Sequence, residues 1–432
     1  MIVVRFLYSL LFHLLLPLLL LRLLWRSLRA PEYARRWQER FGMGIPAQSG
    51  GLWVHAVSVG ETLAAAPLIN AWRVAHPGEP VFVSTMTPTG SARVRALWGS
   101  SVGHAYAPYD LPWAWLLFLR RVRPRVLVIM ETELWPNMLA AARTRGIPVV
   151  LANARLSERS ARGYGRAGWL TRPMLENLSL IAAQDQATAS RFLGLGVPAE
   201  RVSVAGSIKF DLAPPADLHD QASALRSTWR LEGRPVLVAA STHEGEDEML
   251  LAAFARVRQC YPEALLILVP RHPERFDSVA RLVREQGLSL CRRSRGEAVV
   301  PGVAVFLGDS MGELLLWFAL ADVAFVGGSL VPVGGHNMLE PIALDVPTVC
   351  GPHVFNFQVI ADELVQAGAL QLVPAEALGE VLIHLVETPA LAMAQAAAGH
   401  AVMARNRGAL ARQLALIEQV MSGPATHEHL RP

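Results

Sequence analysis

From Leu52 onward, short runs of apolar residues alternate with segments in which apolar residues recur every three or four positions. Runs of the first kind predict buried strands and segments of the second kind predict helices. Eleven strands are expected: LWVHAV, PVFVSTM, VLVIM, PVVLANA, LIAAQ, VSVAGS, PVLVAAS, ALLILVPRH, VAVFLGD, DVAFVGG and PTVCG. Their alternation with helices indicates an α/β protein with mainly parallel sheets.

The alternation pauses at FDLAPPADLHDQ and then begins again. A chain of 432 residues is also long for one core. We therefore expect an interdomain linker at 210–224 between two Rossmann-like, doubly wound domains, 31–209 and 225–424, and a loose tail at 425–432. Such domains bind ligands beyond the carboxyl ends of their strands, which makes the cleft between the two domains the expected active site.

Residues 1–30 are predicted to form a membrane anchor. The stretch Phe6–Leu21 has no charge and is mostly leucine, and arginines crowd the chain after it. That asymmetry predicts a cytoplasmic downstream chain. A cleavable signal peptide is the alternative, but no clear cleavage site precedes RAPEYARRWQER. Because Pro17 and Arg22 interrupt the apolar run, the helix could span the membrane or lie in its interface.

Charge is unevenly distributed along the chain. Residues 1–209 carry 24 Lys and Arg against 11 Asp and Glu, a net charge of +13, and the remainder carries 16 against 25, a net charge of −9. The basic half favours an anionic surface or ligand, although a solvated charge bias is the alternative. Lys209 is the single lysine. Three scattered cysteines indicate neither a disulfide framework nor a zinc site.

Four junctions between a predicted strand and helix have the spacing of a helix capping box. They are Ser58–Glu61, Ser241–Glu244, Ser310–Glu313 and Asn337–Glu340. Ordinary capping accounts for each, because the hydroxyl or amide accepts from the first helical turn and the Glu reaches back to the cap. All four also lie at the ligand-binding edge of their sheets. Glu61 therefore has two possible roles: it caps the helix, or it takes part in catalysis.

The segment GGSLVPVGGHNMLEP surrounds a predicted helix start at Asn337 with glycines, which favours either a tight turn or an anion site. No Lys or Arg occurs between Arg295 and Arg405. A phosphate here would need backbone amides, His336, or a cation from elsewhere, for which Arg271 is the best candidate. The motif is neither the dinucleotide fingerprint nor a P-loop, so a nicotinamide cofactor is not expected.

The strand VLVIM runs into Glu131 and Glu133, whose spacing would place both carboxylates on one side of a continuing strand. Paired carboxylates can bind a metal or face a ligand. Because no His or Asp cluster accompanies them, no metal site is expected.

These motifs in this order resemble the 3-deoxy-D-manno-octulosonic acid (Kdo) transferases of lipid A assembly. The stretches that carry the resemblance are HAVSVGETLAA, TMTPTGSARV, IMETELWPN, ANARLSERS, GSIKFD, STHEGEDE, LILVPRHPERF, DSMGEL, VGGSLVPVGGHNMLEP and GPHVFNF. The resemblance implies a GT-B glycosyltransferase that transfers Kdo from CMP-Kdo to lipid IVA at the cytoplasmic face of the inner membrane, with inversion. It implies no metal, no other cofactor and no nucleic acid partner, an acceptor site in the N-terminal domain and a donor site in the C-terminal domain.

The resemblance also implies roles for individual residues. Glu61 is the implied general base, Glu131 a second catalytic carboxylate and Lys209 a possible charge-stabilising residue. The implied donor-binding residues are Ser241, Arg271, His272, Met311, Gly312, Glu313, Gly335, Asn337 and Glu340. A helix N-terminus would favour the charged form of Glu61 and weaken it as a base. Another nucleotide-sugar transferase or an epimerase of the same fold is the alternative, and a tethered binding protein or a noncatalytic assembly protein is a rival of a different class.

Overall fold

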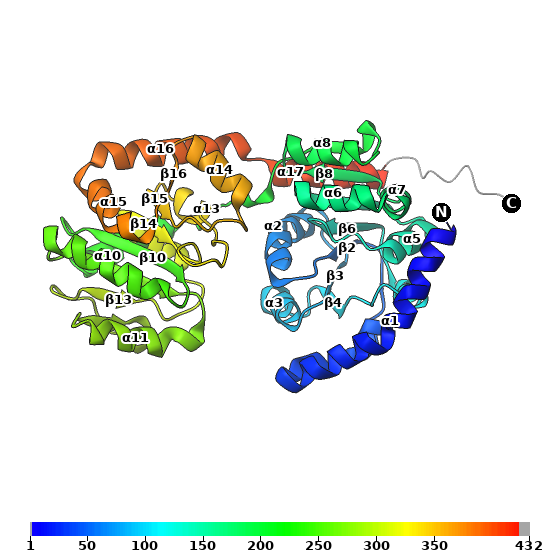
Figure 1. The fold of residues 1–432 in the computed structure, drawn as a ribbon, viewed down its shortest axis with the longest axis horizontal. Coiled ribbons are helices and arrows are strands. Elements are labelled where there is room, and N and C mark those ends of the chain that lie inside the picture. The colour runs from blue at the N-terminus through cyan, green and yellow to red at the C-terminus, as the bar shows by residue number, and fades with distance from the viewer. Residues whose placement is uncertain (1, 423–432) are drawn as a thin grey trace. The chain divides into compact units, whose positions relative to one another are not determined.

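The computed structural model describes residues 2–422, so the predicted tail at 425–432 lies outside the described residues. The chain forms two compact units: one comprises the residues up to Asp211 together with those from Arg407 onward, and the other comprises Leu212–Asn406. Each unit is built on its own seven-stranded parallel sheet with helices on both sides (Figure 1). The expected α/β class, with two doubly wound domains, is confirmed.

The sheet of the first unit has the strand order β4-β3-β2-β6-β7-β8-β9. Its strands are β2 (Leu52–His55), β3 (Val81–Thr85), β4 (Gly103–Tyr106), β6 (Val126–Met130), β7 (Val149–Ala154), β8 (Leu180–Ala183) and β9 (Val202–Val204), and β1 (Gln48–Ser49) pairs separately with β5 (Val122–Arg123). Its helices are α1 (Ile2–Arg29), α2 (Val59–Ala75), α3 (Pro88–Trp98), α4 (Pro112–Arg121), α5 (Pro136–Thr144), α6 (Glu158–Arg166), α7 (Gly168–Leu175), α8 (Gln186–Gly194) and α17 (Ala409–Ser422), with the 3₁₀ turns η1 (Pro31–Ala34), η2 (Trp37–Phe41), η3 (Ala199–Arg201) and η4 (Ile208–Phe210).

The sheet of the second unit has the order β12-β13-β11-β10-β14-β15-β16. Its strands are β10 (Val236–Thr242), β11 (Leu265–Pro270), β12 (Leu290–Arg292), β13 (Val305–Leu307), β14 (Val323–Val326), β15 (Thr348–Cys350) and β16 (Leu370–Leu372). Its helices are α9 (Leu218–Thr228), α10 (Glu246–Cys260), α11 (Phe276–Glu285), α12 (Leu314–Leu320), α13 (Leu339–Ile342), α14 (Gln358–Gln366), α15 (Ala375–Glu387) and α16 (Pro389–Asn406), with the turns η5 (Pro273–Arg275) and η6 (Arg293–Arg295).

Neighbouring residues of the central strands enter opposite hydrophobic layers. Trp53 and Leu127 belong to the layer on one face of the first sheet, and Val54 and Val128 belong to the layer on the other. Successive side chains of a strand point to opposite faces, so a strand buried on both faces is apolar throughout. The sheet therefore has helices on both faces, and its free carboxyl edge is left to position polar residues.

The C-terminal helix α17 belongs to the first unit, although residues 225–424 were expected to form the second domain. Ile417 is buried in the core layer that contains Val54. The side chain of Gln413, also buried, accepts from the Asn153 N–H at 2.8 Å and donates to the Gly206 carbonyl at 2.9 Å. The expected linker at 210–224 also differs, because α9 begins within it at Leu218.

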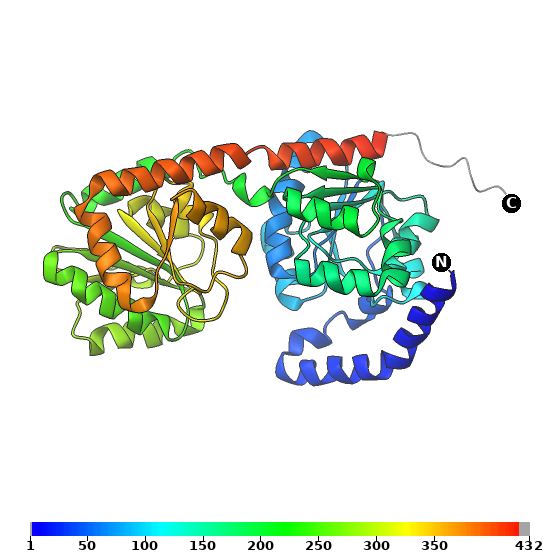
Figure 2. The ribbon, with the colours of Figure 1, turned by 45° about the horizontal axis from the view of Figure 1, so that its top comes forward.

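The N-terminal helix α1 lies along the outside of the first unit (Figure 2). Its segment Val3–Leu28 is long and apolar enough to cross a membrane, with a mean hydropathy of 2.1. Phe12 and Leu16 pack on a small cluster of buried residues: Phe41, Leu111 and Ala114. Most of its other leucines are exposed. The helix is thus a candidate membrane anchor that touches its own domain on one side.

Candidate functional site

Glu61 lies in the first turn of α2, beyond the carboxyl end of β2. The Val57 N–H donates to its Oε2 at 2.8 Å, and the Ser58 hydroxyl donates to its Oε1 at 2.9 Å. Ser58 Oγ in turn accepts from the Glu61 N–H at 3.3 Å, as an N-cap does. The carboxylate of Glu61 therefore turns back to the helix end, and the capping-box interpretation is confirmed at this junction.

Capping does not make Glu61 an ordinary surface carboxylate. Burial raises its pKa to about 7; the hydrogen bonds from Val57 and Ser58 oppose this rise, and the carboxylates of Glu133 and Glu131 add to it. Burial therefore outweighs the helix end, which was expected to favour the charged form. A carboxylate with a pKa near 7 is suited to accept a proton at neutral pH.

Glu131 and Glu133 follow β6, the neighbour of β2 in the sheet. Glu131 has a φ of +58°, a left-handed conformation that is uncommon outside glycine and costs energy. Because the strand ends at Met130, the two carboxylates are placed by this turn and not by the alternation of a strand. The Trp135 indole donates to Glu133 Oε2 at 3.1 Å, and burial raises the pKa of Glu133.

Lys209, the single lysine of the sequence, lies close to Glu131. Burial lowers the pKa of Lys209, the negative charge of Glu131 opposes that change, and the positive charge of Arg155 adds to it. The first unit thus brings Glu61, Glu131 and Lys209 to one edge of its sheet. A half-buried lysine between an acid and an arginine can compensate negative charge without the bulk of a guanidinium.

The glycine-rich segment of the second unit is organised by Glu246, the first residue of α10. Glu246 is fully buried, and its carboxylate accepts from the N–H groups of Gly328, Ser329 and Leu330 at 2.6 to 2.9 Å. A fourth N–H, that of His243, donates to it at 2.8 Å. These amides were expected to be available to a phosphate. A protein carboxylate occupies them instead, so they shape the loop rather than bind a ligand anion.

Arg271 is close enough to Glu340 and His336 for its charge to act on both side chains. Burial raises the pKa of Glu340, whereas the amide of Asn337, which donates to Glu340 at 3.0 Å, and the charge of Arg271 both lower it. Burial lowers the pKa of His336 to about 4, and Arg271 contributes to this fall. The structure thus brings Arg271, Asn337 and Glu340 together.

Two histidines of this cluster share one hydrogen bond. The Nε2 atoms of His243 and His336 lie 2.7 Å apart, so one ring donates and the other accepts. The His272 ring meets His243 edge-on, with centroids 5.2 Å apart. Burial lowers the pKa of His243 as well as that of His336. The pair is therefore neutral at physiological pH and presents polar but uncharged ring atoms.

The remaining donor-site candidates differ in their surroundings. Glu313 pairs with Arg293 at 2.6 Å, and this interaction lowers the pKa of Glu313. Met311 is 66 % exposed, and Gly312 has a φ of +90° with open space where a side chain would be. Ser241 has a φ of +58° at the end of β10. Among residues 2–422, no hydrogen bond or ion pair links these four residues to Arg271.

Three of the four segments with capping-box spacing form other structures. Helix α10 begins at Glu246, four residues later than the Ser241–Glu244 spacing implies, and Gly245 precedes it. The hydroxyl of Ser310 binds Glu313, but α12 starts only at Leu314 with no side-chain cap. Helix α13 is a single turn, Leu339–Ile342, too short to supply the helix dipole expected at Asn337.

Sequence patterns missed Glu246 and the role of Glu133. Buried Glu246 has no spacing signal for its role, because three of its four partners lie more than 80 residues away. The glycine at position 245 was a sequence signal that a helix could begin there, and in the structure it has a φ of +87°.

Within residues 2–422, no group of three or more His, Cys, Asp or Glu is arranged to hold a metal ion.

Comparison with known proteins relates this chain to one family. Residues 35–212 match the family model described as 3-deoxy-D-manno-octulosonic-acid transferase. The chain is 42 % identical over 419 residues to the 3-deoxy-D-manno-octulosonic acid transferase of Haemophilus influenzae, covering 96 % of this chain and 98 % of that one. It is 39 % identical over 414 residues to the enzyme of the same name from Bordetella pertussis, covering 91 % of this chain and 95 % of that one.

Among solved structures, the UDP-GlcNAc 2-epimerase of Neisseria meningitidis bound to UDP-GlcNAc superimposes with a TM-score of 0.56 at 14 % identity, covering 86 % of this chain and 99 % of that chain. A likeness at this identity concerns the fold alone. The relatives, in contrast, match nearly the whole chain at high identity. The chain therefore belongs to the 3-deoxy-D-manno-octulosonic acid transferases, and it is a glycosyltransferase.

Proposed function

We propose that the enzyme transfers Kdo from CMP-Kdo to lipid IVA, with inversion at the anomeric carbon and with Glu61 as the general base. The observation that carries this proposal is the environment of Glu61: a half-buried carboxylate beside two others, with a pKa raised to about 7. A base is most effective when its pKa lies near the working pH.

In the proposed step, the Glu61 carboxylate accepts the proton of a glucosamine hydroxyl of the acceptor. The hydroxyl oxygen forms a bond to the anomeric carbon of Kdo while the bond from that carbon to the phosphate oxygen of CMP breaks. CMP leaves with the bonding electron pair, and the proton remains on Glu61. Glu131 and Glu133 assist by making the charged form of Glu61 less stable, and so a better proton acceptor.

The second unit would hold the donor. Arg271 is the cation positioned to pair with its phosphate, because the amides of Gly328, Ser329 and Leu330 already bind Glu246. Glu340 could accept from ribose hydroxyls beside Arg271. In the first unit, Lys209 supplies a second cation close to Glu131. The leaving group is a phosphate anion, so cations can stabilise it without a strong acid.

We further propose that α1 lies in the membrane interface and keeps the catalytic units in the cytoplasm. The Ser9 hydroxyl donates to Asn137 at 3.1 Å, and the Trp113 indole donates to His13 at 3.2 Å. The Tyr8 hydroxyl binds Asp110. A helix that spanned the bilayer would carry these polar residues away from their partners on the domain. An in-plane helix keeps the contacts and exposes its leucines to lipid.

The orientation of α1 can be tested by labelling. Val3→Cys, in a chain whose three native cysteines are replaced by alanine, would be treated in intact cells with a maleimide that does not cross the inner membrane. An in-plane helix predicts no labelling until the membrane is opened. Labelling in intact cells would mean that the N-terminus reaches the outer side and that α1 spans.

Mass spectrometry of the reaction product tests the proposed function. The purified enzyme, incubated with CMP-Kdo and lipid IVA, should yield lipid IVA heavier by at least one Kdo unit, and NMR of the new linkage should show the inverted configuration. UDP-sugars serve as competing donors. Transfer from a UDP-sugar with none from CMP-Kdo would instead support the alternative, another sugar transferase of this fold.

A further inference from the structure

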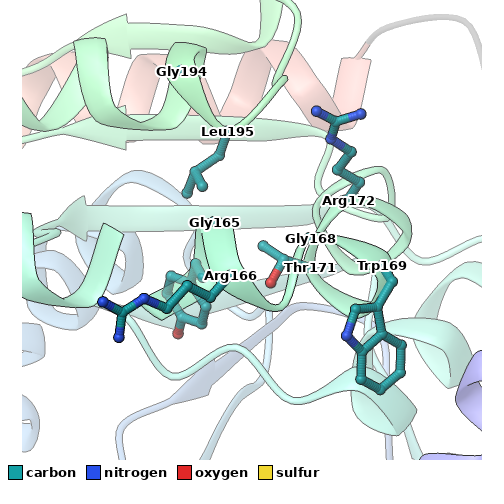
Figure 3. A pocket seen from close by; sticks show the side chains of 9 residues that line it. Gly165, Arg166, Gly168, Trp169, Thr171, Arg172, Gly194 and Leu195 are labelled. Atoms are coloured by element: carbon teal, nitrogen blue, oxygen red, sulfur yellow. The ribbon is translucent and has the colours of Figure 1, made fainter. Parts of the chain in front are cut away.

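Arg40 is a buried cation that the proposed reaction does not use. The arginines of the first unit lie for the most part at the surface. Figure 3 shows two of them, Arg166 and Arg172, beside a hollow of about 420 Å³, with their side chains pointing away from one another. Arg40, in the turn η2, is only 2 % exposed. Removing a guanidinium group from water is costly, so its burial requires compensating contacts.

No carboxylate supplies that compensation. Within residues 2–422, Arg40 forms no ion pair, because the neighbouring Glu39 pairs with Arg36 at 2.7 Å instead. The Glu39 carboxylate also accepts from the Tyr106 N–H at 2.8 Å. The guanidinium of Arg40 lies over the Tyr106 ring, 4.5 Å from its centroid, and in the described part of the chain its Nε has no hydrogen-bond partner. Burial lowers the pKa of Arg40. Packing alone does not require a buried charge here, which indicates a further role.

The guanidinium of Arg40 reaches the turn that follows β3. Its Nη2 donates to the Met86 carbonyl at 3.1 Å, and its Nη1 lies 4.0 Å from the Met86 sulfur. Met86 is the first residue after β3, and Thr87 caps α3 by accepting from the Gly90 N–H at 3.0 Å. Arg40 therefore fixes the backbone between β3 and α3, beyond the carboxyl end of the strand.

The turn after β3 is joined to the proposed base. The Met86 N–H donates to the Val57 carbonyl at 3.0 Å, which continues the parallel pairing of β2 and β3 beyond the strand ends. The Val57 N–H donates to Glu61 Oε2 at 2.8 Å. A Cβ atom on Gly90 would lie 3.5 Å from the Ser58 carbonyl carbon, so the start of α3 also packs on the cap of α2. Three successive hydrogen bonds therefore lead from the buried guanidinium to the carboxylate.

We propose that Arg40 is a positioning residue of the reaction: it holds the turn after β3 and, through Val57, the Glu61 carboxylate that takes the acceptor proton. The inference rests on the proposed function, since it acts through the base of that same reaction. Removal of the guanidinium should lower the rate of transfer and leave the KM for CMP-Kdo within about twofold of wild type.

The first test is the pH dependence of kcat/KM for the acceptor in Arg40→Met. The Val57 hydrogen bond lowers the pKa of Glu61, so a loosened turn should let that pKa rise. Arg40→Met should therefore lower kcat/KM about threefold more at pH 6 than at pH 8.5, measured on folded enzyme. Arg36→Met removes the neighbouring guanidinium but no bond to the turn after β3, and it should keep the wild-type ratio. An equal loss at both pH values is what a purely structural role predicts, and it would overturn the proposal.

A double-variant cycle tests whether Arg40 acts through Glu61. Adding Arg40→Met to Glu61→Gln should lower the rate less than about twofold further, because the carboxylate on which Arg40 acts is already gone. Losses that multiply would mean that Arg40 acts elsewhere, and the proposal would fail. A Glu61→Gln enzyme that keeps most of its rate would instead contradict the proposed base. A slow Glu61→Gln enzyme together with a wild-type profile for Arg40→Met would contradict this inference alone.

Arg40→Lys provides the conservative variant. Lysine keeps the charge but lacks the planar fork of the guanidinium, so its kcat/KM ratio between the two pH values should lie between those of wild type and Arg40→Met. If Arg40→Met does not accumulate as folded enzyme, Arg40→Lys takes its place in both measurements. A wild-type ratio in Arg40→Lys would then overturn the proposal.

Discussion

Ser58 and Glu61 are joined by two hydrogen bonds that run in opposite directions. The Ser58 hydroxyl donates to the Glu61 carboxylate at 2.9 Å and accepts from the Glu61 N–H at 3.3 Å. The pair caps α2 and at the same time holds the carboxylate beside Glu131 and Glu133. Capping and the proposed catalytic role are therefore compatible, because the helix end positions a carboxylate whose pKa burial has raised.

The pH dependence of transfer should report this pKa. A base acts in its deprotonated form, so kcat/KM should rise with pH and level off above about 7. Glu133→Gln removes a neighbouring negative charge and should move the rise to lower pH. A rate that is constant from pH 5.5 to 8 in wild type would contradict this assignment.

The same pKa predicts how stability depends on pH. A carboxyl group whose pKa is higher in the folded state stabilises the fold fully below its unfolded value, and this contribution is lost as pH rises through the folded value. For Glu61 the loss falls between pH 4.5, the ordinary pKa of a glutamate, and about pH 7. Glu61→Gln should therefore gain melting temperature relative to wild type as pH rises across this range, and thermal melts at pH 5 and pH 8 check the sign.

Glu246 should be essential to the glycine-rich loop of the second unit. Glu246→Gln places an amide donor among four backbone N–H donors, and we expect a loss of about 2 to 4 kcal/mol in the free energy of unfolding with a higher KM for CMP-Kdo. Glu248→Gln, an exposed position on the same helix, is the control. Urea unfolding and donor kinetics measure the two effects, and equal behaviour of the variants would refute the role given to Glu246.

Lys209 should not be replaceable by arginine. The side chain is half-buried between Glu131 and Arg155, where a larger planar guanidinium adds bulk beside an existing positive charge. Lys209→Arg should lower kcat roughly tenfold, and Lys209→Met should lower it further because it removes the charge. Steady-state kinetics at saturating CMP-Kdo test this. Full activity of the arginine variant would show that a compact cation is not needed.

The placement of α17 gives a prediction for stability alone. Gln413→Ala leaves the buried Asn153 N–H and the partly buried Gly206 carbonyl without this partner and should cost about 2 to 4 kcal/mol of unfolding free energy. Gln419→Ala, an exposed glutamine on the same helix, should cost under about 0.5 kcal/mol. Urea unfolding of both variants compares them, and equal costs would mean that α17 does not stabilise the first unit.

Much of the fold followed from apolar runs, because strands buried on both faces are recognisable without context. All eleven expected strands form. Three strands of the two seven-stranded sheets were missed because each is short and partly polar: β4, with the sequence GHAY, β12, with LCR, and β16, with LQL. The position of α17 could not be predicted. Its amphipathic pattern shows that it packs on something, but not which sheet receives it.

The site was predictable where side chains act near their own position in the chain. The Ser58–Glu61 pair is local, so its spacing indicated its bonds. The raised pKa of Glu61 was not predictable, because it depends on burial and on carboxylates some 70 residues away. The amides occupied by Glu246 could not be foreseen for the same reason, and only the folded structure shows that the expected phosphate-binding backbone is already bound.

The most direct test of the central claim is the rate of Kdo transfer by Glu61→Gln at saturating CMP-Kdo and acceptor. Glutamine keeps the size of the side chain but cannot accept the proton, so the rate should fall by about a hundredfold or more, while CMP-Kdo binding is retained. Ser58→Ala, which removes the cap at a cost of about 1 kcal/mol, should keep most of the rate. A Glu61→Gln enzyme that retains most of its activity would contradict the assignment of Glu61 as the base.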